Sequence, residues 1–255
     1  MKKIYFALSL TLLLGIYNSL QAQTNVYTTS GGEMIFSWGQ LEYTQKFMND
    51  YPDAQIVDNP VRFTVFFHFQ QLVHMDISDN IGIFSGFGMR NIGLISDERL
   101  PENYNTLDPG YFNAKIIRRT YTLGLPIALK LGSFKNNFYF YGGAEIEWAF
   151  HSKEKWWPNL DRSGTKTKTR DWWPKNINTW LPSYFVGIQF PGGTNIKFRY
   201  YNHDFLNHAF GNTNATNRND VVSDLTKYTK SSMVYVSLSY QINTAKALHG
   251  EFEDY

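Results

Sequence analysis

The chain has 255 residues, contains no cysteine, and carries 24 basic and 22 acidic side chains, a formal charge of +2. The absence of cysteine excludes disulfides, thiol catalysis, cysteine-based metal sites and a lipoprotein anchor. So small a net charge gives no indication of nucleic-acid binding. Aromatic residues make up 17% of the chain while the mean hydropathy is only −0.37. That combination is typical of a membrane barrel, in which only every other residue of a strand meets lipid.

The first residues have the three parts of a secretory signal. Lys2 and Lys3 precede an apolar run from Ile4 to Ile16, and a polar stretch then leads to Ala22. The run is too short to span a bilayer as a helix, and no later run reaches the ~18 residues that such a helix needs. Cleavage after Ala22 would remove two lysines and no acidic residue. We therefore predict export, with a signal peptide at 1–22. Together with the strand pattern described below, this gives a barrel at 23–242 and a periplasmic tail at 243–255.

Apolar and polar residues alternate along the segment 61–77. Its odd positions are apolar except for Gln71, and its even positions include Arg62, His74 and Asp76. A period of two sustained for this length indicates a β-strand with one apolar and one wet face. The same pattern predicts eight strands in all, at approximately 33–43, 61–77, 81–96, 117–132, 138–151, 180–190, 194–201 and 231–242.

Short and long connections alternate between these strands. Three are short and contain the Asn, Asp or Gly residues of tight turns, and four are long and polar. This arrangement is typical of outer-membrane barrels, with periplasmic turns and extracellular loops. We predict an all-β fold: an eight-stranded antiparallel up-and-down transmembrane β-barrel in the cell outer membrane. The short connections are 78–80, 133–137 and 191–193, and the long ones are 44–60, 97–116, 152–179 and 202–230.

The wet faces of several strands carry charged residues. They would be unfavourable in the apolar core of a soluble barrel, whereas in a membrane barrel they line the lumen. Glu145 and Glu147 lie about 7 Å apart on that face by strand geometry, so they could do acid–base chemistry or line a cation path. We expect a structural ion network instead, because side chains fill the interior of an eight-stranded barrel. Its predicted members are Arg62, Arg90, Arg118, Lys130, Glu145, Glu147, Lys197 and Arg199.

The connection between the fifth and sixth predicted strands contains two similar Trp-Trp-Pro segments. A symmetric hairpin would place Trp157 opposite Trp172 and Trp156 opposite Trp173, where cross-strand aromatic pairs are stabilising. The segment 153–175 is also basic, with seven basic and three acidic residues. It could anchor the barrel at the membrane interface, or bind lipopolysaccharide phosphates, a surface glycan or a partner protein. The candidate residues are Trp156, Trp157, Trp172, Trp173, Lys166, Lys168 and Arg170.

A histidine-containing segment follows the seventh predicted strand. His203, Asp204 and His208 could contribute to a nucleophilic triad of the kind that lipid A deacylases place at a barrel rim, or could hold a metal ion. Asp204 follows His203 where such a triad would want a serine, and short His/Asp spacings are weak signals. We expect a solvated loop here, without a metal ion or a cofactor.

The whole pattern resembles a known family. The segment Gly31-Gly32-Glu33-Met34-Ile35-Phe36-Ser37 and the segment Lys197-Phe198-Arg199-Tyr200-Tyr201 are similar to strands of the small outer-membrane β-barrel family that includes PorT-like proteins. The resemblance implies the fold and the location, and it brings no catalytic motif. A few members serve as subunits of secretion or envelope machinery.

Three functions follow as hypotheses. The first is a non-enzymatic outer-membrane barrel that acts as a scaffold or accessory subunit of an envelope or secretion assembly through its extracellular loops. The second is an enzyme that modifies outer-leaflet lipid, and the third is a small-solute channel. The expected partners are outer-membrane lipid and lipopolysaccharide, and an envelope protein bound through the loops. Nucleic acid is not an expected partner.

Overall fold

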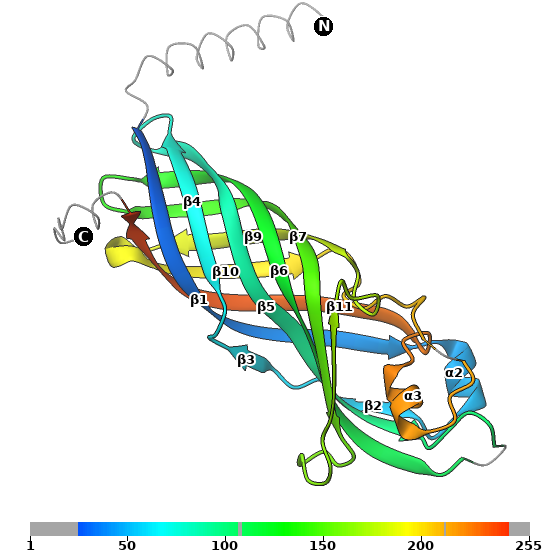
Figure 1. Cartoon of the computed structure of the whole chain (residues 1–255). Coiled ribbons are helices and arrows are strands. Elements are labelled where there is room, and N and C mark those ends of the chain that lie inside the picture. The colour runs from blue at the N-terminus through cyan, green and yellow to red at the C-terminus, as the bar shows by residue number, and fades with distance from the viewer. Residues whose placement is uncertain (1–24, 107–108, 212, 245–255) are drawn as a thin grey trace, which may run out of the picture.

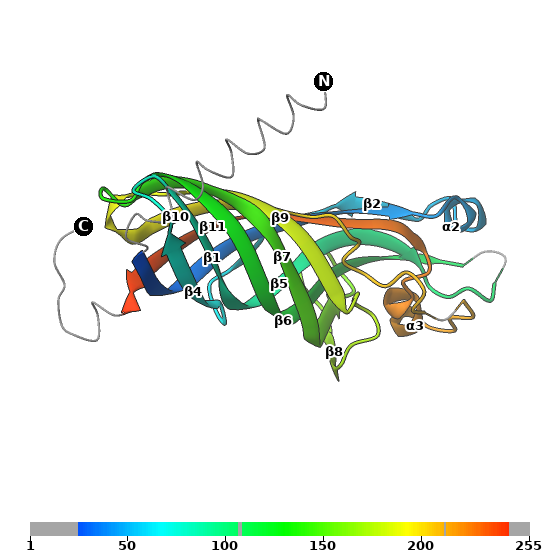
Figure 2. The same cartoon turned by 90° about the horizontal axis from the view of Figure 1, so that it is seen from above.

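The computed structural model describes residues 25–106, 109–211 and 213–244. The predicted signal peptide lies outside the described residues, as does the predicted tail beyond Thr244. Eleven described strands form one antiparallel sheet, and eight of them close into a ring, because β11 pairs back with β1. Figures 1 and 2 show this barrel from two sides. The ring consists of β1 (Asn25–Tyr43), β4 (Phe69–Asp76), β5 (Ile81–Pro101), β6 (Tyr111–Ser133), β7 (Phe138–Trp157), β9 (Trp180–Gln189), β10 (Thr194–Tyr201) and β11 (Tyr228–Asn243).

The predicted eight-stranded up-and-down barrel is therefore confirmed. Short connections join β4 to β5, β6 to β7 and β9 to β10 at one end of the barrel, which we call the turn end. The described chain also begins and ends there (Figure 1). The opposite end, the loop end, holds α2 (Gln45–Asp50), β2 (Gln55–Asp58), β8 (Thr167–Trp172) and α3 (Arg218–Ser223). The short strand β3 (Arg62–Thr64) lies against the middle of β1. The 3-10 turn η1 (Pro191–Gly193) is one of the short connections.

Several strands are longer than the alternation of apolar residues predicted. β1 begins at Asn25, β5 continues to Pro101, β6 begins at Tyr111 and β7 continues to Trp157. Most of the predicted loop 97–116 is therefore strand. Its outward residues are polar, so they carry none of the apolar periodicity on which the prediction depended. These extensions project beyond the rest of the ring at the loop end (Figure 1).

The predicted single strand 61–77 is wrong, because the chain breaks between β3 and β4. β4 pairs with the first part of β1, and β3 pairs further along it, at Ile35 to Ser37. Between them Phe67 has φ 63°, which interrupts the ladder. Past this break β1 and β5 approach each other directly, and the Ser37 hydroxyl donates to the Gly93 carbonyl at 2.7 Å. The period-two pattern continues across the break, which is why the sequence did not reveal it.

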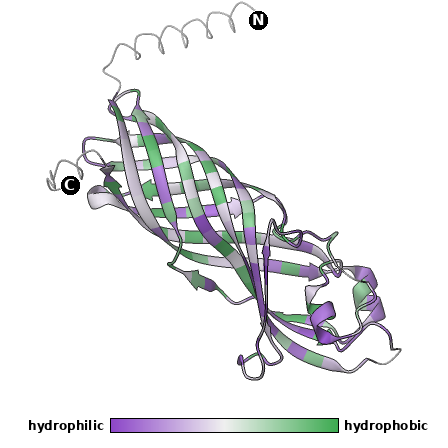
Figure 3. Ribbon diagram, viewed as in Figure 1, coloured by the Kyte–Doolittle hydropathy of each residue, from purple (hydrophilic) through white to green (hydrophobic). Residues whose placement is uncertain are grey.

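The outer wall of the ring is apolar, whereas the inner wall carries buried charged residues together with a small apolar cluster that includes Phe84 and Phe185. On β6, Leu125 and Ile127 are each 64% exposed, while the inward Lys130 is fully buried. Figure 3 shows the same alternation of hydrophobic and hydrophilic residues along neighbouring strands. Apolar side chains facing out around a closed ring are the signature of a barrel that spans a lipid bilayer. Among the described helices, none is both long and apolar enough to cross a membrane.

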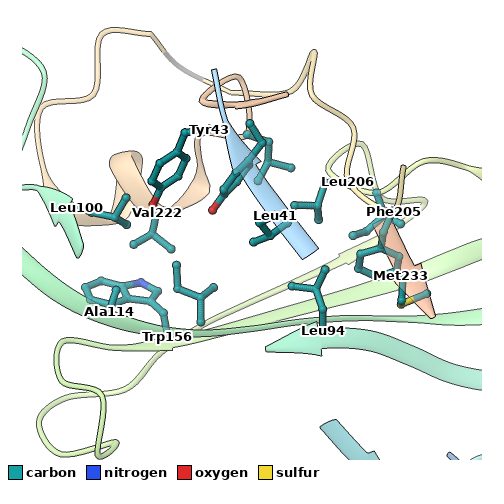
Figure 4. Close-up of a cluster of buried hydrophobic side chains, with 14 of the residues drawn as sticks. Leu41, Tyr43, Leu94, Leu100, Ala114, Trp156, Phe205, Leu206, Val222 and Met233 are labelled. Atoms are coloured by element: carbon teal, nitrogen blue, oxygen red, sulfur yellow. The ribbon is translucent and has the colours of Figure 1, made fainter. Parts of the chain in front are cut away.

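Beyond the apolar outer band, the strand extensions enclose an apolar core. Inward residues such as Leu41 and Leu94 pack against Leu206 and Val222, which come from the connection between β10 and β11 (Figure 4). All four side chains are at most 4% exposed. The loop end is thus a packed domain above the band, and its core closes the mouth of the barrel.

Candidate functional site

The lumen of the barrel contains a network of ion pairs centred on Arg90. The guanidinium of Arg90, from β5, donates through Nε to Glu33 at 2.9 Å and through Nη1 to Glu147 at 2.9 Å. The same Nη1 pairs with Glu145. Because successive inward positions of β7 supply both Glu145 and Glu147, one arginine reaches both carboxylates and a third from β1 across the lumen.

Two cations on β10 complete this network. Lys197 lies 2.6 Å from Glu33, and Arg199 pairs with Glu145 and lies 3.5 Å from Glu147. Three carboxylates therefore face three cations. Hydroxyl groups fill further acceptor positions: Ser237 donates to Glu33 at 2.6 Å, and Tyr201 donates to Glu147. Such a balanced, hydrogen-bonded network is what makes buried charges tolerable.

The network leaves no carboxylate of the predicted pair available for acid–base chemistry. Both Glu145 and Glu147 are at most 3% exposed and already accept from arginine. The cavity beside them, lined by Arg90, Glu145 and Lys197 among others, has a volume of about 20 Å³. That volume holds roughly one water molecule.

Three of the predicted lumen residues lie elsewhere. Arg118 pairs with Glu154 at the loop end, and Lys130 pairs with Asp76 at the turn end. Arg62 donates to the Asn91 backbone and side-chain oxygens, at 3.1 and 2.8 Å. The predicted single network is thus four separate groups: the Arg90 network and the three groups around Arg118, Lys130 and Arg62. Sequence reasoning missed the acidic partners, although each occupies an inward position of the same alternation: Glu33, Asp76, Glu98 and Glu154.

A second buried cluster lies in the loop end around Glu98. Its carboxylate accepts from Tyr43 at 2.7 Å and from Tyr228 at 2.8 Å, and Arg118 lies 3.5 Å away. Burial by itself raises the pKa of this carboxyl, but the charges of Arg118 and Lys227 hold the pKa of Glu98 below its ordinary value. Glu98 is therefore ionised and fixes strands β1, β5 and β11 to one another.

Two cations hold helix α3 over this cluster. The Lys227 ammonium donates to the carbonyls of Val221 and Asp224, at 2.7 and 2.5 Å, and Arg118 donates to Val222 at 2.8 Å. These carbonyls belong to the last turn of α3, where a cation is favourable. Burial lowers the pKa of Lys227 to about 8. The α3 segment is in this way fastened as a cap on the mouth of the barrel.

The paired tryptophans do not face one another as predicted. Trp172 lies opposite His151, and Trp156 lies opposite Thr167. The hairpin is therefore not symmetric about the Trp-Trp-Pro segments, and its tip contains left-handed residues at Arg162 and Gly164.

The four tryptophans also have different environments. Trp156 points into the loop-end core, where its indole donates to Asn219 at 3.1 Å. Trp157 is partly buried beside Arg162, whose guanidinium lies 5.7 Å from its ring centre. Trp172 and Trp173 are 68% and 64% exposed on the outer surface, and Trp173 stacks on Trp148 with ring centres 5.1 Å apart.

Basic residues lie side by side on the outer surface just beyond these aromatic rings. Arg119 on β6 is opposite Lys153 on β7, which is opposite Arg170 on β8. One step further from the band, Lys155 is opposite Lys168. Burial, followed by the charges of Arg119 and Arg170, lowers the pKa of Lys153. We call this group the basic ladder, which consists of Arg119, Lys153, Lys155, Lys166, Lys168 and Arg170. The predicted Lys166, Lys168 and Arg170 belong to it, and Arg119 could not be assigned to it without the pairing of β6 with β7.

The rim around His203 contains a serine that the sequence did not place there. Ser231, from β11, lies with its hydroxyl 2.9 Å from His208 Nε2 and 3.3 Å from the Asp204 carboxylate. In a nucleophilic triad the acid orients the imidazole, whereas here acid and imidazole both contact the serine. Ser231 is fully buried, and its hydroxyl also accepts from the Leu206 amide. His203 contacts Asn178 at 3.3 Å, and no group of three or more His, Asp or Glu in the described chain could hold a metal ion.

Comparisons with known proteins give the following findings. No protein-family model matches the sequence, and no curated protein matches it significantly. Among solved structures, Ail of Yersinia pestis has 10% identity and a TM-score of 0.32, covering 85% of this chain and 99% of its own. OprG from Pseudomonas aeruginosa has 11% identity and a TM-score of 0.35, covering 86% and 96%. Neisserial surface protein A has 8% identity and a TM-score of 0.34, covering 87% and 99%.

These scores are too low to carry an argument about function. The assignment as a membrane-spanning eight-stranded barrel depends on the strand pairing and on the sidedness of its wall. Membership of the PorT-like family stays a prediction.

Proposed function

We propose that the protein is an integral outer-membrane barrel that acts through its extracellular loop end as a non-enzymatic scaffold or accessory subunit of an envelope assembly. The observation that carries this proposal is the packed domain at the loop end. A membrane-spanning strand needs about 9–11 residues, whereas β5, β6 and β7 have 21, 23 and 20. About half of each strand therefore builds structure outside the bilayer.

The orientation follows from the ends of the chain. The N-terminal sequence favours export, and both ends of the described chain lie at the turn end. A barrel with an even number of strands and short turns on the side of its termini has those turns in the periplasm. The loop end, with its basic ladder and exposed tryptophans, then faces the cell exterior, where lipopolysaccharide and envelope proteins are the available partners.

The interior argues against a small-solute channel. The Arg90 network spans the lumen at one level, and the apolar core around Leu94 fills the barrel mouth at another. An ion would have to displace buried, paired side chains at the first level and apolar packing at the second. Both steps are costly.

The rim argues against a lipid-modifying enzyme. The Ser231 hydroxyl is buried and is held by Asp204 and by the Leu206 amide, so it cannot attack an acyl group in the surrounding membrane. Its imidazole neighbour, His208, forms no hydrogen bond with a carboxylate of the described chain, so no acid orients the ring.

Isolation from the native outer membrane tests the proposal. We expect that a tagged chain extracted in mild detergent brings down a stoichiometric envelope protein, identified by mass spectrometry. A variant in which a short Gly-containing turn replaces residues 158–166 should remain in the membrane and lose that protein. Single-channel steps in a planar bilayer, or hydrolysis of lipid A acyl chains by the purified barrel, would contradict the proposal.

A further inference from the structure

The basic ladder places like charges side by side on the protein surface. Arg119, Lys153 and Arg170 are direct cross-strand neighbours on three adjacent strands. Like charges that face one another across a strand pair are destabilising. None of the six ladder residues forms an ion pair with any residue of the described chain.

Two other outward lysines of the barrel wall have acidic partners. Lys115, four residues before Arg119 on β6, lies 2.7 Å from Asp97 on the neighbouring strand. Lys230 on β11 lies 3.0 Å from Glu42 on β1. The ladder residues thus lack, among the described residues, the acidic partners that Lys115 and Lys230 have, which indicates that their negative partner comes from outside the chain.

The position of the ladder relative to the membrane identifies that partner. A row of aromatic side chains lies on the same face, two residues nearer the membrane on each strand. It consists of the cross-strand neighbours Tyr121, His151 and Trp172. Below this row begins the apolar band, at Leu123 beside Trp148. Tryptophan and tyrosine rings lie at the level of the lipid headgroups. A strand rises about 3.3 Å per residue, so the cations lie one headgroup layer above the hydrocarbon.

The strand β8 extends this surface and has no other partner. It pairs only with β7 among the described strands, and it adds Lys168 and Arg170 beside Lys155 and Lys153. Its outward side chains are exposed, whereas none of its residues is buried in the core. The hairpin therefore widens a charged surface rather than completing the barrel.

We propose that the basic ladder binds the phosphate groups of the glycolipid in the outer leaflet of the membrane. This inference depends on the proposed outer-membrane orientation and names one ligand class for the loop end. Arginine and lysine side chains that are cross-strand neighbours on three strands suit a headgroup that carries more than one phosphate. Phosphate bound between the cations relieves their mutual repulsion, and the aromatic row below positions the acyl chains.

The test uses the full barrel in nanodiscs of phosphatidylcholine, alone or with bisphosphorylated lipid A or with lipid A from which both phosphates have been removed. We expect bisphosphorylated lipid A to raise the Tm of the wild type, and dephosphorylated lipid A to leave it unchanged. In K153Q/R170Q the affinity for bisphosphorylated lipid A should fall about thirtyfold. The control K46Q/R99Q removes one exposed lysine and one exposed arginine at the same end of the barrel and should bind as the wild type does.

A second variant tests whether repulsion between the ladder cations, and not only their total charge, drives lipid binding. Lys153→Glu places a carboxylate between Arg119 and Arg170, so it should raise the Tm in phosphatidylcholine alone and abolish the response to bisphosphorylated lipid A. Inorganic phosphate in solution should give a much smaller shift than the lipid. An equal shift with both lipid A forms, or an equal shift in K153Q/R170Q, would overturn the proposal. An acidic protein bound by the ladder in place of lipid would also overturn it. Neither result would affect the proposed closed, non-enzymatic barrel, which the conductance and hydrolysis measurements test separately.

Discussion

Removing the cation at the centre of the lumen should destabilise the barrel strongly. In Arg90→Met, three buried carboxylates would face the two remaining cations, Lys197 and Arg199. The lost guanidinium lies 2.9 Å from both Glu33 and Glu147 and also contacts Glu145. Breaking a buried pair by removing one partner costs about 3–5 kcal/mol. Because Arg90 contacts all three carboxylates, we expect a loss near the upper end of that range.

The free energy of unfolding can be measured by urea titration in phosphatidylcholine vesicles, with tryptophan fluorescence as the signal. Arg99→Met is the matched control, since Arg99 is exposed on the same strand, and its cost should stay within about 0.5 kcal/mol. The double variant Arg90→Met with Glu145→Gln restores the charge balance. Its cost should be clearly smaller than the sum of the two single costs. A loss in Arg90→Met no larger than in Arg99→Met would refute the idea that this network holds the barrel together.

Three further predictions concern the band, the core and the cap. Ile127→Arg, in the middle of the outer band, should lower the free energy of unfolding by about 2–4 kcal/mol and block membrane assembly. Asn113→Arg, on the outward face of the same strand beyond the band, should assemble normally. Heat-modifiable migration on a gel distinguishes the two variants. Trp156→Ala should cost about 3–5 kcal/mol in the loop-end core and expose it to protease, while Trp172→Ala should leave it resistant. Burial lowers the pKa of Lys227 to about 8 from 10.5, so between these values the unfolded state binds more protons and stability rises with pH. Relative to Lys227→Met, the wild type should gain about 3 kcal/mol across that window, and a constant difference in unfolding free energy would contradict the buried-ammonium interpretation.

The ring itself could be predicted because a membrane barrel needs apolar residues at every outward position that meets lipid. Along β6, the outward positions from Leu131 to Leu123 are all apolar, and the inward Lys130 could not face lipid. That rule specifies strand number and sidedness without any tertiary information. Partners across the lumen could not be predicted. Glu33 and Arg90 are 57 residues apart in the sequence, and only the closed ring brings them to 2.9 Å.

The loop end could be predicted less well, because beyond the band the inward residues are apolar and the outward residues are polar. Below Tyr121 the outward face of β6 is apolar, and the inward face carries Lys130 among small residues. Beyond Arg118, the inward residues Ile116 and Ala114 are buried in an apolar core, and outward Lys115 and Asn113 are polar. A single strand thus passes from the sidedness of a membrane barrel to that of a soluble protein. The alternation of period two continues through this change, so an analysis that follows only apolar outward residues ends the strand too early.

The change of sidedness itself marks where the membrane ends. On β7 it falls between Trp148, in the band, and Lys153, in the ladder, and on β6 between Leu123 and Arg119. Because the two strands are paired, these positions lie at one height on the barrel wall, which is the height at which the aromatic row occurs. The basic residues come directly after the change, whereas Lys115, further out, already has a carboxylate partner. The ladder cations therefore gather just beyond this change, where lipid phosphates are within reach, and this position is the physical reason to connect the ladder with the membrane rather than with a soluble ligand.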